Sequence, residues 1–190
     1  METRVEQEFV DILLEKGKES RDKNLDSRKK LAGMLDHEYY YKNYEEWFVP
    51  FFDPYVNAYI DAVSDYRSDA FKSPTTSWIL NALWINYQKA NEYNPPHQHN
   101  KDLSFVIYLQ VPAELEKEFK ESEGVHATTG PGTINFNYGI EMPFLIDTFF
   151  KFPEVRDILI FPAWLTHYVH AFKSDVERIS VSGNIKFKYD

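Results

Sequence analysis

The feature that most constrains the fold of this chain is a change in residue pattern near residue 77. From there onward, short runs rich in Ile, Val, Phe, Tyr and Trp are separated by turns rich in Pro, Gly, Asn and charged residues. These runs predict six strands, at residues 78–87, 103–110, 133–138, 158–161, 168–172 and 178–187. In the last run, Ile179, Val181 and Ile185 interleave with polar residues, as in a strand with one face in a core. Many short strands of this kind indicate a β-sandwich or barrel.

The residues before this point are predicted to form helices. Val5, Phe9 and Leu13 recur at the spacing of one helix face, with Glu, Gln and Lys between them. The dipeptide Asp53-Pro54 combines an N-cap residue with proline at the first helical position, so a second helix is predicted to start there.

One further helix is predicted inside the strand-rich part. Leu115 and Phe119 stand four residues apart among Glu and Lys, which predicts a helix at 112–122, and turn residues predict a loop at 124–132. We therefore expect a single domain over 1–190. It would have a helical support region at 1–76 and a β core at 77–190 that contains an insertion at 112–149.

Composition excludes several classes of protein. Apolar residues make up 43% of the chain and aromatic residues 17%, a load that disordered chains do not carry. The net charge of −9 argues against tight binding to nucleic acid, and the lysines of residues 16–30 are interleaved with acids, as on a solvated helix face. The chain has no apolar run of the ~18 residues that a membrane span needs, no secretory segment at its start and no cysteine. We expect a cytoplasmic protein, or one in the host cytoplasm if the chain is encoded by a phage.

Three histidines fall at the edges of predicted strands. His97 and His99 are two residues apart, and in an extended segment such residues point to the same side and could converge on one cation. His167 follows the apolar strand at 158–161. Each of these also has a structural interpretation, as a polar turn or a buried core histidine. His170 is a competing ligand, but it lies three residues after His167 and would face the other side.

Arg178 and Ser180 open the last predicted strand and share one face of it. If that face points into the barrel, the guanidinium requires an anionic partner, because a buried unpaired charge is costly. A carboxylate bound in bidentate fashion would supply that partner. The alternative is an edge strand with Arg178 in water.

Taken in order, these motifs resemble the Fe(II)- and 2-oxoglutarate-dependent oxygenase superfamily. The segments that resemble it are Trp84-Ile-Asn-Tyr87, His97-Gln-His99, Leu103-Ser-Phe-Val-Ile-Tyr-Leu109, Phe161-Pro-Ala-Trp-Leu-Thr-His167 and Glu177-Arg-Ile-Ser180. The resemblance covers about 78–187 and is closest to small bacterial and phage enzymes related to prolyl hydroxylases. It implies a mostly β fold with N-terminal helices, a double-stranded β-helix. It also implies Fe(II), 2-oxoglutarate and O2 as cofactor and co-substrates, with succinate and CO2 as co-products.

The resemblance also implies roles for individual residues. His97 corresponds to the first metal ligand and His167 to the last, while Arg178 and Ser180 would hold the distal carboxylate of 2-oxoglutarate. Tyr87, Tyr108 and Asn86 are further candidates for contact with the co-substrate, and core packing is the alternative for both tyrosines.

Position 99 departs from the commoner pattern, in which an acid occupies this place. Either three imidazoles bind the metal, or Asp102 reaches in as the third ligand. We favour His99, because it has the strand spacing of a partner to His97, whereas Asp102 has the opposite parity.

The substrate is not determined by the sequence. A prolyl or other peptidyl residue, or a small molecule, fits an acidic protein better than a duplex nucleic acid does. Aromatic residues around Tyr39, Tyr44 and Trp47, and the insertion at 112–149, could border a substrate groove, although core packing also explains the aromatics. A non-oxidative metal-binding cupin-like protein and a jelly-roll binding module remain as alternatives, and neither requires an inward Arg178.

Overall fold

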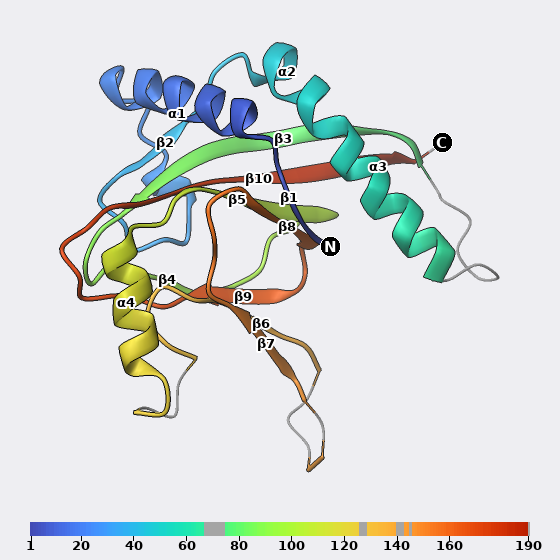
Figure 1. The fold of residues 1–190 in the computed structure, drawn as a ribbon. Coiled ribbons are helices and arrows are strands. Elements are labelled where there is room, and N and C mark those ends of the chain that lie inside the picture. Colours follow the sequence, from blue (N-terminus) through green and yellow to red (C-terminus); the bar gives the residue numbers. More distant parts are fainter. Residues whose placement is uncertain (67–74, 126–128, 140–142, 145, 190) are drawn as a thin grey trace.

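Two antiparallel β-sheets pack face to face and form a jelly roll, with helices over the outer face of the larger sheet (Figure 1). The computed structural model describes residues 1–66, 75–125, 129–139, 143–144 and 146–189. The larger sheet has the order β1-β8-β5-β10-β3-β2 and the smaller one the order β4-β9-β6-β7. The strands are β1 (Glu2–Arg4), β2 (Glu38–Tyr40), β3 (Thr75–Gln88), β4 (Asn94–His97), β5 (Leu103–Gln110), β6 (Ile134–Asn137), β7 (Thr148–Lys151), β8 (Asp157–Pro162), β9 (Thr166–Val169) and β10 (Arg178–Tyr189).

The six predicted strands are present. The one expected at 168–172 is shifted and forms β9 at Thr166–Val169. Four strands of three or four residues, β1, β2, β4 and β7, were not predicted. β4 contains two prolines and lies at an edge of the smaller sheet, the position where a missing backbone donor costs least.

The helices are α1 (Gln7–Asp22), η1 (Arg28–Lys30), α2 (Tyr44–Trp47), α3 (Val49–Tyr66) and α4 (Ala113–Ser122). The predicted start at Asp53-Pro54 is wrong, because α3 begins at Val49 and Pro54 lies inside it. The reason is tertiary packing. Phe48 and Phe52 are fully buried, and their ring centroids lie 5.7 and 4.2 Å from that of Phe105 on β5. Burying these rings stabilises helix at positions where local signals place none. The helix predicted at 112–122 is confirmed as α4.

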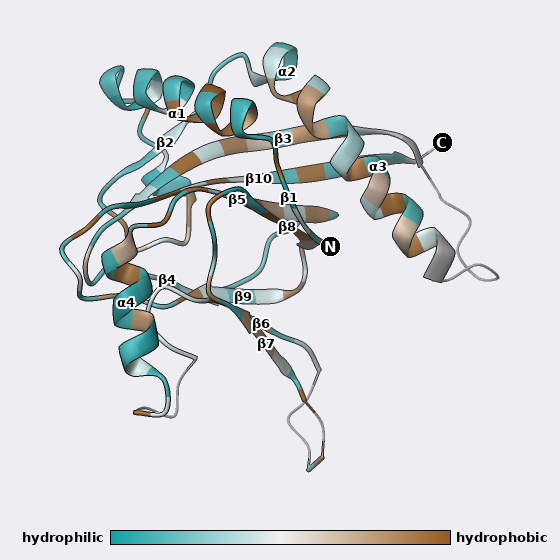
Figure 2. Ribbon diagram, viewed as in Figure 1, coloured by the Kyte–Doolittle hydropathy of each residue, from teal (hydrophilic) through white to brown (hydrophobic). Residues whose placement is uncertain are grey.

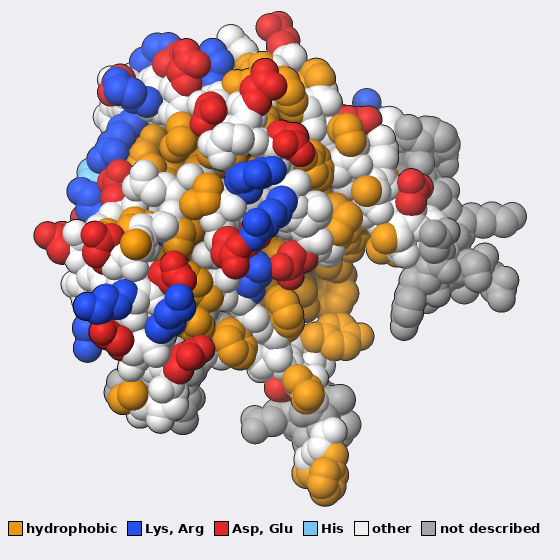
Figure 3. All heavy atoms as spheres, in the orientation of Figure 1, with side chains coloured by type: hydrophobic (Ala, Val, Ile, Leu, Met, Phe, Trp, Pro, Cys, Tyr) orange, Lys and Arg blue, Asp and Glu red, His pale blue; other side chains and the backbone are white. Residues whose placement is uncertain are grey.

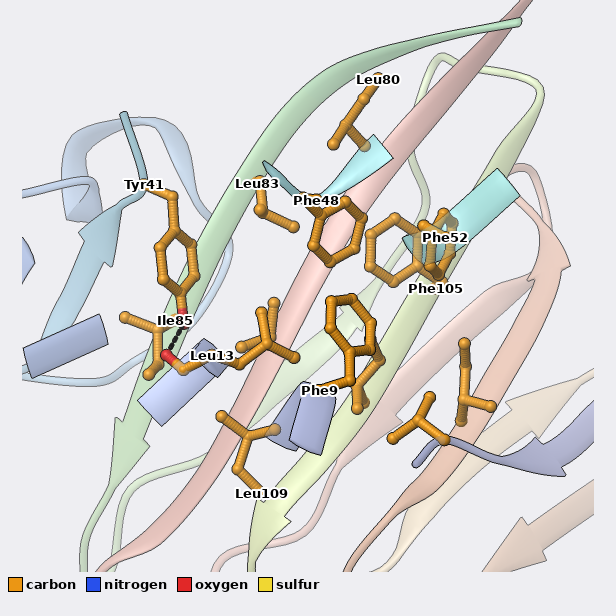
Figure 4. Packing of buried hydrophobic residues seen from close by; sticks show 14 of the residues in the cluster. Phe9, Leu13, Tyr41, Phe48, Phe52, Leu80, Leu83, Ile85, Phe105 and Leu109 are labelled. Atoms are coloured by element: carbon orange, nitrogen blue, oxygen red, sulfur yellow. Dashed lines mark hydrogen bonds between the residues drawn. The ribbon is translucent and has the colours of Figure 1, made fainter. Parts of the chain in front are cut away.

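The main core lies between helices α1 to α3 and the larger sheet (Figure 4). Leu13 of α1 lies there beside Ile85, and the Tyr41 hydroxyl donates to the Leu13 carbonyl at 2.8 Å. The ring centroid of Phe9, also on α1, lies 5.3 Å from that of Phe48. The hydrophobic residues of α1 are confined to part of its surface, as expected of an amphipathic helix (Figure 2).

The two faces of the larger sheet differ in character. On β3 and β10, the residues toward the helices are apolar, whereas the intervening residues Asn86, Ser180 and Ser182 point toward the smaller sheet. On β5 and β8, both faces are mainly apolar, and Val106 and Phe161 join a second cluster between the sheets. The space between the sheets is therefore apolar on one side and polar on the other.

The surface is of mixed charge on the face that Figure 3 shows, with a group of hydrophobic side chains at the β6–β7 hairpin. Tyr138, Phe144 and Phe149 are among the exposed aromatic residues there. Parts of the insertion predicted at 112–149, namely 126–128, 140–142 and 145, lie outside the described residues. Within the described ranges, none of the helices combines the length and apolar character needed to cross a bilayer.

Candidate metal centre and carboxylate pocket

Three histidines converge between the sheets. His97 ends β4 and is the register partner of His167 on β9, so antiparallel pairing brings these two side chains together. His99 lies two residues beyond β4, and its backbone N–H donates to the Ala163 carbonyl at 2.8 Å. One potential ligand atom from each ring lies within 4.8 Å of the other two, which is the geometry of a group that could hold a metal ion.

Backbone carbonyls orient two of the rings. Nδ1 of His97 lies 2.7 Å from the Pro95 oxygen, and Nδ1 of His167 lies 2.9 Å from the Leu165 oxygen. A carbonyl can only accept, so Nδ1 carries the proton in both rings and Nε2 keeps its lone pair. This arrangement is common among histidine ligands, whose other ring nitrogen donates to a carbonyl or carboxylate.

Burial keeps His99 and His167 neutral. Burial, with a smaller contribution from the adjacent His97, lowers the pKa of His167 to about 3 and that of His99 to about 4. A neutral imidazole is the form that binds a metal ion. At neutral pH His99 and His167 therefore offer ligand nitrogens without first having to lose protons.

A polar pocket continues from the histidines along the inner face of the larger sheet. Ser180 on β10 is the register partner of Asn86 on β3 and of Tyr108 on β5, so three neighbouring strands contribute one row of polar side chains. Arg178 lies two residues before Ser180 and pairs in register with Gln88. All except Gln88 line the same hollow as the three histidines.

The guanidinium of Arg178 is buried without an acidic partner. Arg178 is 4% exposed. Its Nη1 donates to the Gly132 carbonyl at 2.7 Å, and its Nη2 donates to the side-chain oxygen of Gln88. Among the described residues no carboxylate lies within 4 Å of it, and Nε has no hydrogen-bond partner. Burial lowers the pKa of Arg178. A buried cation in this state favours an anion in the pocket.

Two other polar atoms in the pocket lack partners. The Tyr108 hydroxyl and Oδ1 of Asn86 are buried with no hydrogen bond in the described part of the molecule. Burial raises the pKa of Tyr108 to about 12, so its hydroxyl remains a donor at neutral pH. Buried polar groups without partners are rare in folded proteins, and these two atoms, together with Nε of Arg178, belong to residues that line one hollow. A small dicarboxylate beside a metal ion fits the donors present.

Most residues predicted from the sequence meet in this hollow, and two do not. His97, His99, His167, Arg178, Ser180, Tyr108 and Asn86 all line it. Tyr87 packs in the core on the opposite face, with Arg21 above its ring at 4.5 Å, so the expected contact of Tyr87 with the co-substrate is corrected. Asp102 is absent from the histidine group, and its carboxylate accepts the Phe187 N–H at 2.7 Å. Gln88 was missed, although it has the same strand parity as Asn86.

Comparison with known protein families identifies the chain. The family model described as "Putative 2OG-Fe(II) oxygenase" matches residues 82–184, which is more than half of the 190 residues. The chain belongs to the 2OG-Fe(II) oxygenase family. It is therefore a 2-oxoglutarate-dependent dioxygenase, an enzyme class that uses Fe(II), 2-oxoglutarate and O2. No curated protein sequence matches it.

Solved structures confirm the fold of the oxygenase. A viral collagen prolyl hydroxylase from Paramecium Bursaria Chlorella virus-1, in complex with 2OG, has a TM-score of 0.58 at 11% identity, with 97% of this chain and 94% of that one covered. A Pseudomonas putida prolyl-4-hydroxylase has a TM-score of 0.55 at 12% identity, covering 99% and 92%. A Trichoplax adhaerens prolyl hydroxylase in complex with a hypoxia inducible factor peptide fragment has a TM-score of 0.52 at 10% identity, covering 94% and 78%. These likenesses confirm the expected jelly-roll architecture.

Proposed function

We propose that this oxygenase hydroxylates a peptidyl residue, with prolyl as the first candidate, and that His97, His99 and His167 hold its Fe(II). The three imidazoles are close together, and those of His97 and His167 each have one nitrogen free for a metal. An ion held by these three side chains alone would keep coordination positions for the co-substrate and for O2.

The observation that most favours 2-oxoglutarate is the buried guanidinium of Arg178 without an acid beside it. We assign the distal carboxylate of the co-substrate to Arg178 and Ser180, and contacts along its length to the Tyr108 hydroxyl and Asn86. Charge pairing would offset the cost of burying the guanidinium, and the hydroxyl and amide would gain the partners that they lack.

The reaction balances without another reductant. One atom of O2 enters succinate as 2-oxoglutarate loses CO2, and the other is inserted into a C–H bond of the substrate to give a hydroxyl. Iron supplies the activation of O2. The chain's own residues bind and orient the co-substrate, and burial keeps the rings of His99 and His167 unprotonated.

For the third ligand, the positions favour His99 over Asp102. The carboxylate of Asp102 already accepts the Phe187 N–H and bridges the start of β5 to β10. His99→Asp should therefore retain iron binding, because a carboxylate at this position gives the more usual ligand set. Asp102→Ala should leave iron affinity nearly unchanged, and loss of iron binding in Asp102→Ala alone would move the third ligand to Asp102.

The proteins with similar folds support a peptide substrate. The three solved structures reported above are all prolyl hydroxylases, and one is a complex with a peptide fragment. A single oxygenase domain over 1–190, with 1–76 as support and 77–190 as the β core, is the matching proposal for domain organisation. Its support is the main core, which draws residues from Val5 through Ile185.

The experiment that tests the proposal is anaerobic titration followed by turnover. Fe(II) and 2-oxoglutarate together should give a weak visible charge-transfer band, and on admission of O2 the protein should release succinate. Arg178→Lys and Arg178→Ala should lose 2-oxoglutarate affinity by at least about tenfold while binding Fe(II) as the parent does. Equal losses of both ligands would contradict the role of Arg178, and absence of both band and succinate would contradict the function.

A further inference from the structure

A second hollow opens beside the metal centre and forms a groove on the surface. Trp84, His97 and His99 line both the inner pocket and this groove, whereas His167 lines only the inner pocket. His167 is 7% exposed, and His97 and His99 are half-buried. The groove is therefore a route from solvent to the side of the centre where His97 and His99 lie.

The groove is basic although the protein is acidic. Lys30 from η1 and Lys101 from the turn before β5 line it, and no acidic residue does among the described residues. Neither lysine has a carboxylate within 4 Å in the part of the chain that the structure describes. In a chain of net charge −9, two such ammonium groups make a local positive field that attracts anions.

Aromatic and backbone groups complete the groove. Tyr40 and Tyr44 are half-buried and line it together with Trp84, so flat rings are available to pack against a chain. Asn81 and Ala82 of β3 also line it. These tyrosines belong to the aromatic stretch that the sequence marked as a candidate groove border, whereas Tyr39 is in the core.

Among the described residues, one edge of β3 has no partner strand at Asn81 and Ala82, where the groove passes. β2 pairs only with residues 84–86 of β3, and Tyr41 N–H donates to the Leu83 carbonyl at 3.1 Å. No other described strand pairs with that edge, while β10 occupies the opposite edge along the whole of β3. Unpaired strand edges are the sites where extended peptides add by backbone hydrogen bonds.

We propose that this groove binds an acidic polypeptide segment in extended conformation, which runs along the edge of β3 at Asn81 and Ala82 and presents its target residue beside His97 and His99. The proposal rests on the proposed function and adds the substrate's charge and conformation. Lys30 and Lys101 would pair with carboxylates on the segment, and the rings of Tyr40 and Tyr44 would pack on its apolar residues. A single-stranded nucleic acid is the other polyanion that aromatic and basic groups accept, but it is disfavoured by a protein of this charge.

The test measures binding separately from turnover. Fluorescein-labelled peptides of Asp-Pro-Ala repeats and of Lys-Pro-Ala repeats, equal in length, are titrated by fluorescence polarisation into the Fe(II) and 2-oxoglutarate complex without O2. The acidic peptide should bind at least about tenfold more tightly, and its affinity should fall as salt is added. Lys30→Glu and Lys101→Glu should each weaken it about fivefold, whereas Lys89→Glu, at the far end of β3 and outside the groove, should change it less than about twofold.

A separate measurement tests whether the peptide forms backbone hydrogen bonds with β3. An acidic peptide with N-methylated alanines keeps only the aspartate N–H groups as backbone donors and should bind several-fold more weakly. Equal affinity for acidic and basic peptides, or equal effects of Lys89→Glu and Lys101→Glu, would overturn the proposal, as would tighter binding of an oligothymidylate. If succinate is never released, the proposed function fails, and the polarisation data still decide whether the groove binds acidic peptides.

Discussion

Single side chains in this oxygenase differ sharply in environment according to the face they occupy. Tyr108 and Tyr87 are both buried, yet only Tyr108 lies in the pocket, where its hydroxyl has no partner. Tyr108→Phe should weaken 2-oxoglutarate binding about five- to tenfold, the effect of one lost hydrogen bond. Tyr87→Phe is the matched control and should leave that affinity unchanged. Anaerobic titration of the Fe(II) protein with 2-oxoglutarate measures both, and equal losses would show that the hydroxyls act only through stability.

Glu38 is a buried carboxyl that plays no part in the proposed chemistry. Its residue is 1% exposed, neither side-chain oxygen has a partner in the described part of the chain, and burial with nearby Glu92 and Asp26 raises its pKa to about 7. The folded protein holds this proton more tightly than the unfolded chain does, so Glu38 lowers stability as pH rises from about 4.5 to about 7.

Glu38→Gln should therefore raise the melting temperature more at pH 8 than at pH 4.5, because the amide cannot ionise. Thermal unfolding of both proteins at the two pH values tests this. Glu114→Gln is a control at an exposed acid of α4, and it should show no such pH-dependent difference.

The local sequence predicted which residues belong to the site better than it predicted the face of the sheet on which each side chain lies. Asn86 and Tyr87 were both assigned to the co-substrate pocket, but neighbours on a strand point to opposite faces, so only one of them can reach it. Arg178 and Ser180, two apart, were correctly expected on one face. The missing information is register, since the pairing of His97 with His167 arises from strands that are 70 residues apart in sequence.

Among the elements, β10 is central because it pairs with both β3 and β5 and supplies Arg178 and Ser180. Its Gly183 passes beneath Phe105, and an added Cβ would lie 2.5 Å from the Phe105 ring and 2.7 Å from the Ala82 carbonyl oxygen. Real Cβ atoms do not approach so closely, so strand and ring would have to separate. The need for glycine here is set by packing from another strand, which sequence alone does not reveal.

Gly183→Ala should cost roughly 1–3 kcal/mol of unfolding free energy, as overpacked cores do. Phe105→Leu removes part of the clashing ring but loses contacts with Phe48 and Phe52. The double variant should be more stable than the sum of the two single effects predicts. Urea unfolding of the parent, the two single variants and the double variant measures the coupling free energy between the two positions. Strictly additive effects would contradict the prediction, because they would mean that β10 and β5 can separate at no cost in unfolding free energy.

The helical layer shows the same limit at the scale of elements. Periodicity located α1 and α4, since each has apolar residues at helical spacing on one face. The start of α3 was misplaced because Pro54 normally marks a first turn, whereas burial of Phe48 and Phe52 extends the helix before it. β4 was missed for a related reason, since its prolines are acceptable only at an edge, and edges are defined by the whole sheet.

At the scale of the whole molecule, the histidine cluster links stability, pH and metal. His99 and His167 have folded-state pKa values of about 4 and about 3, below the ordinary 6.5, because burial disfavours their charged forms. As pH falls below about 6.5 the unfolded chain takes up protons that the folded protein excludes, so stability decreases from there toward pH 4. Above pH 6.5 these two groups contribute no further change.

Over this range the two histidines outweigh the opposite contribution of Glu38, so the metal-free oxygenase should melt at progressively lower temperature between pH 6.5 and 4.5, and His167→Gln should flatten that dependence. His37→Gln, which lies outside the cluster, should retain it. Fe(II) or Zn(II) should raise the melting temperature at pH 7.5 by more than at pH 5, because protons and metal compete for the same ring nitrogens. A metal-induced shift equal at both pH values, or preserved in His167→Gln, would place the ion elsewhere. The proposed ligands lie on β4, the following loop and β9, so a bound ion would connect these segments in the folded state and raise the melting temperature for that reason.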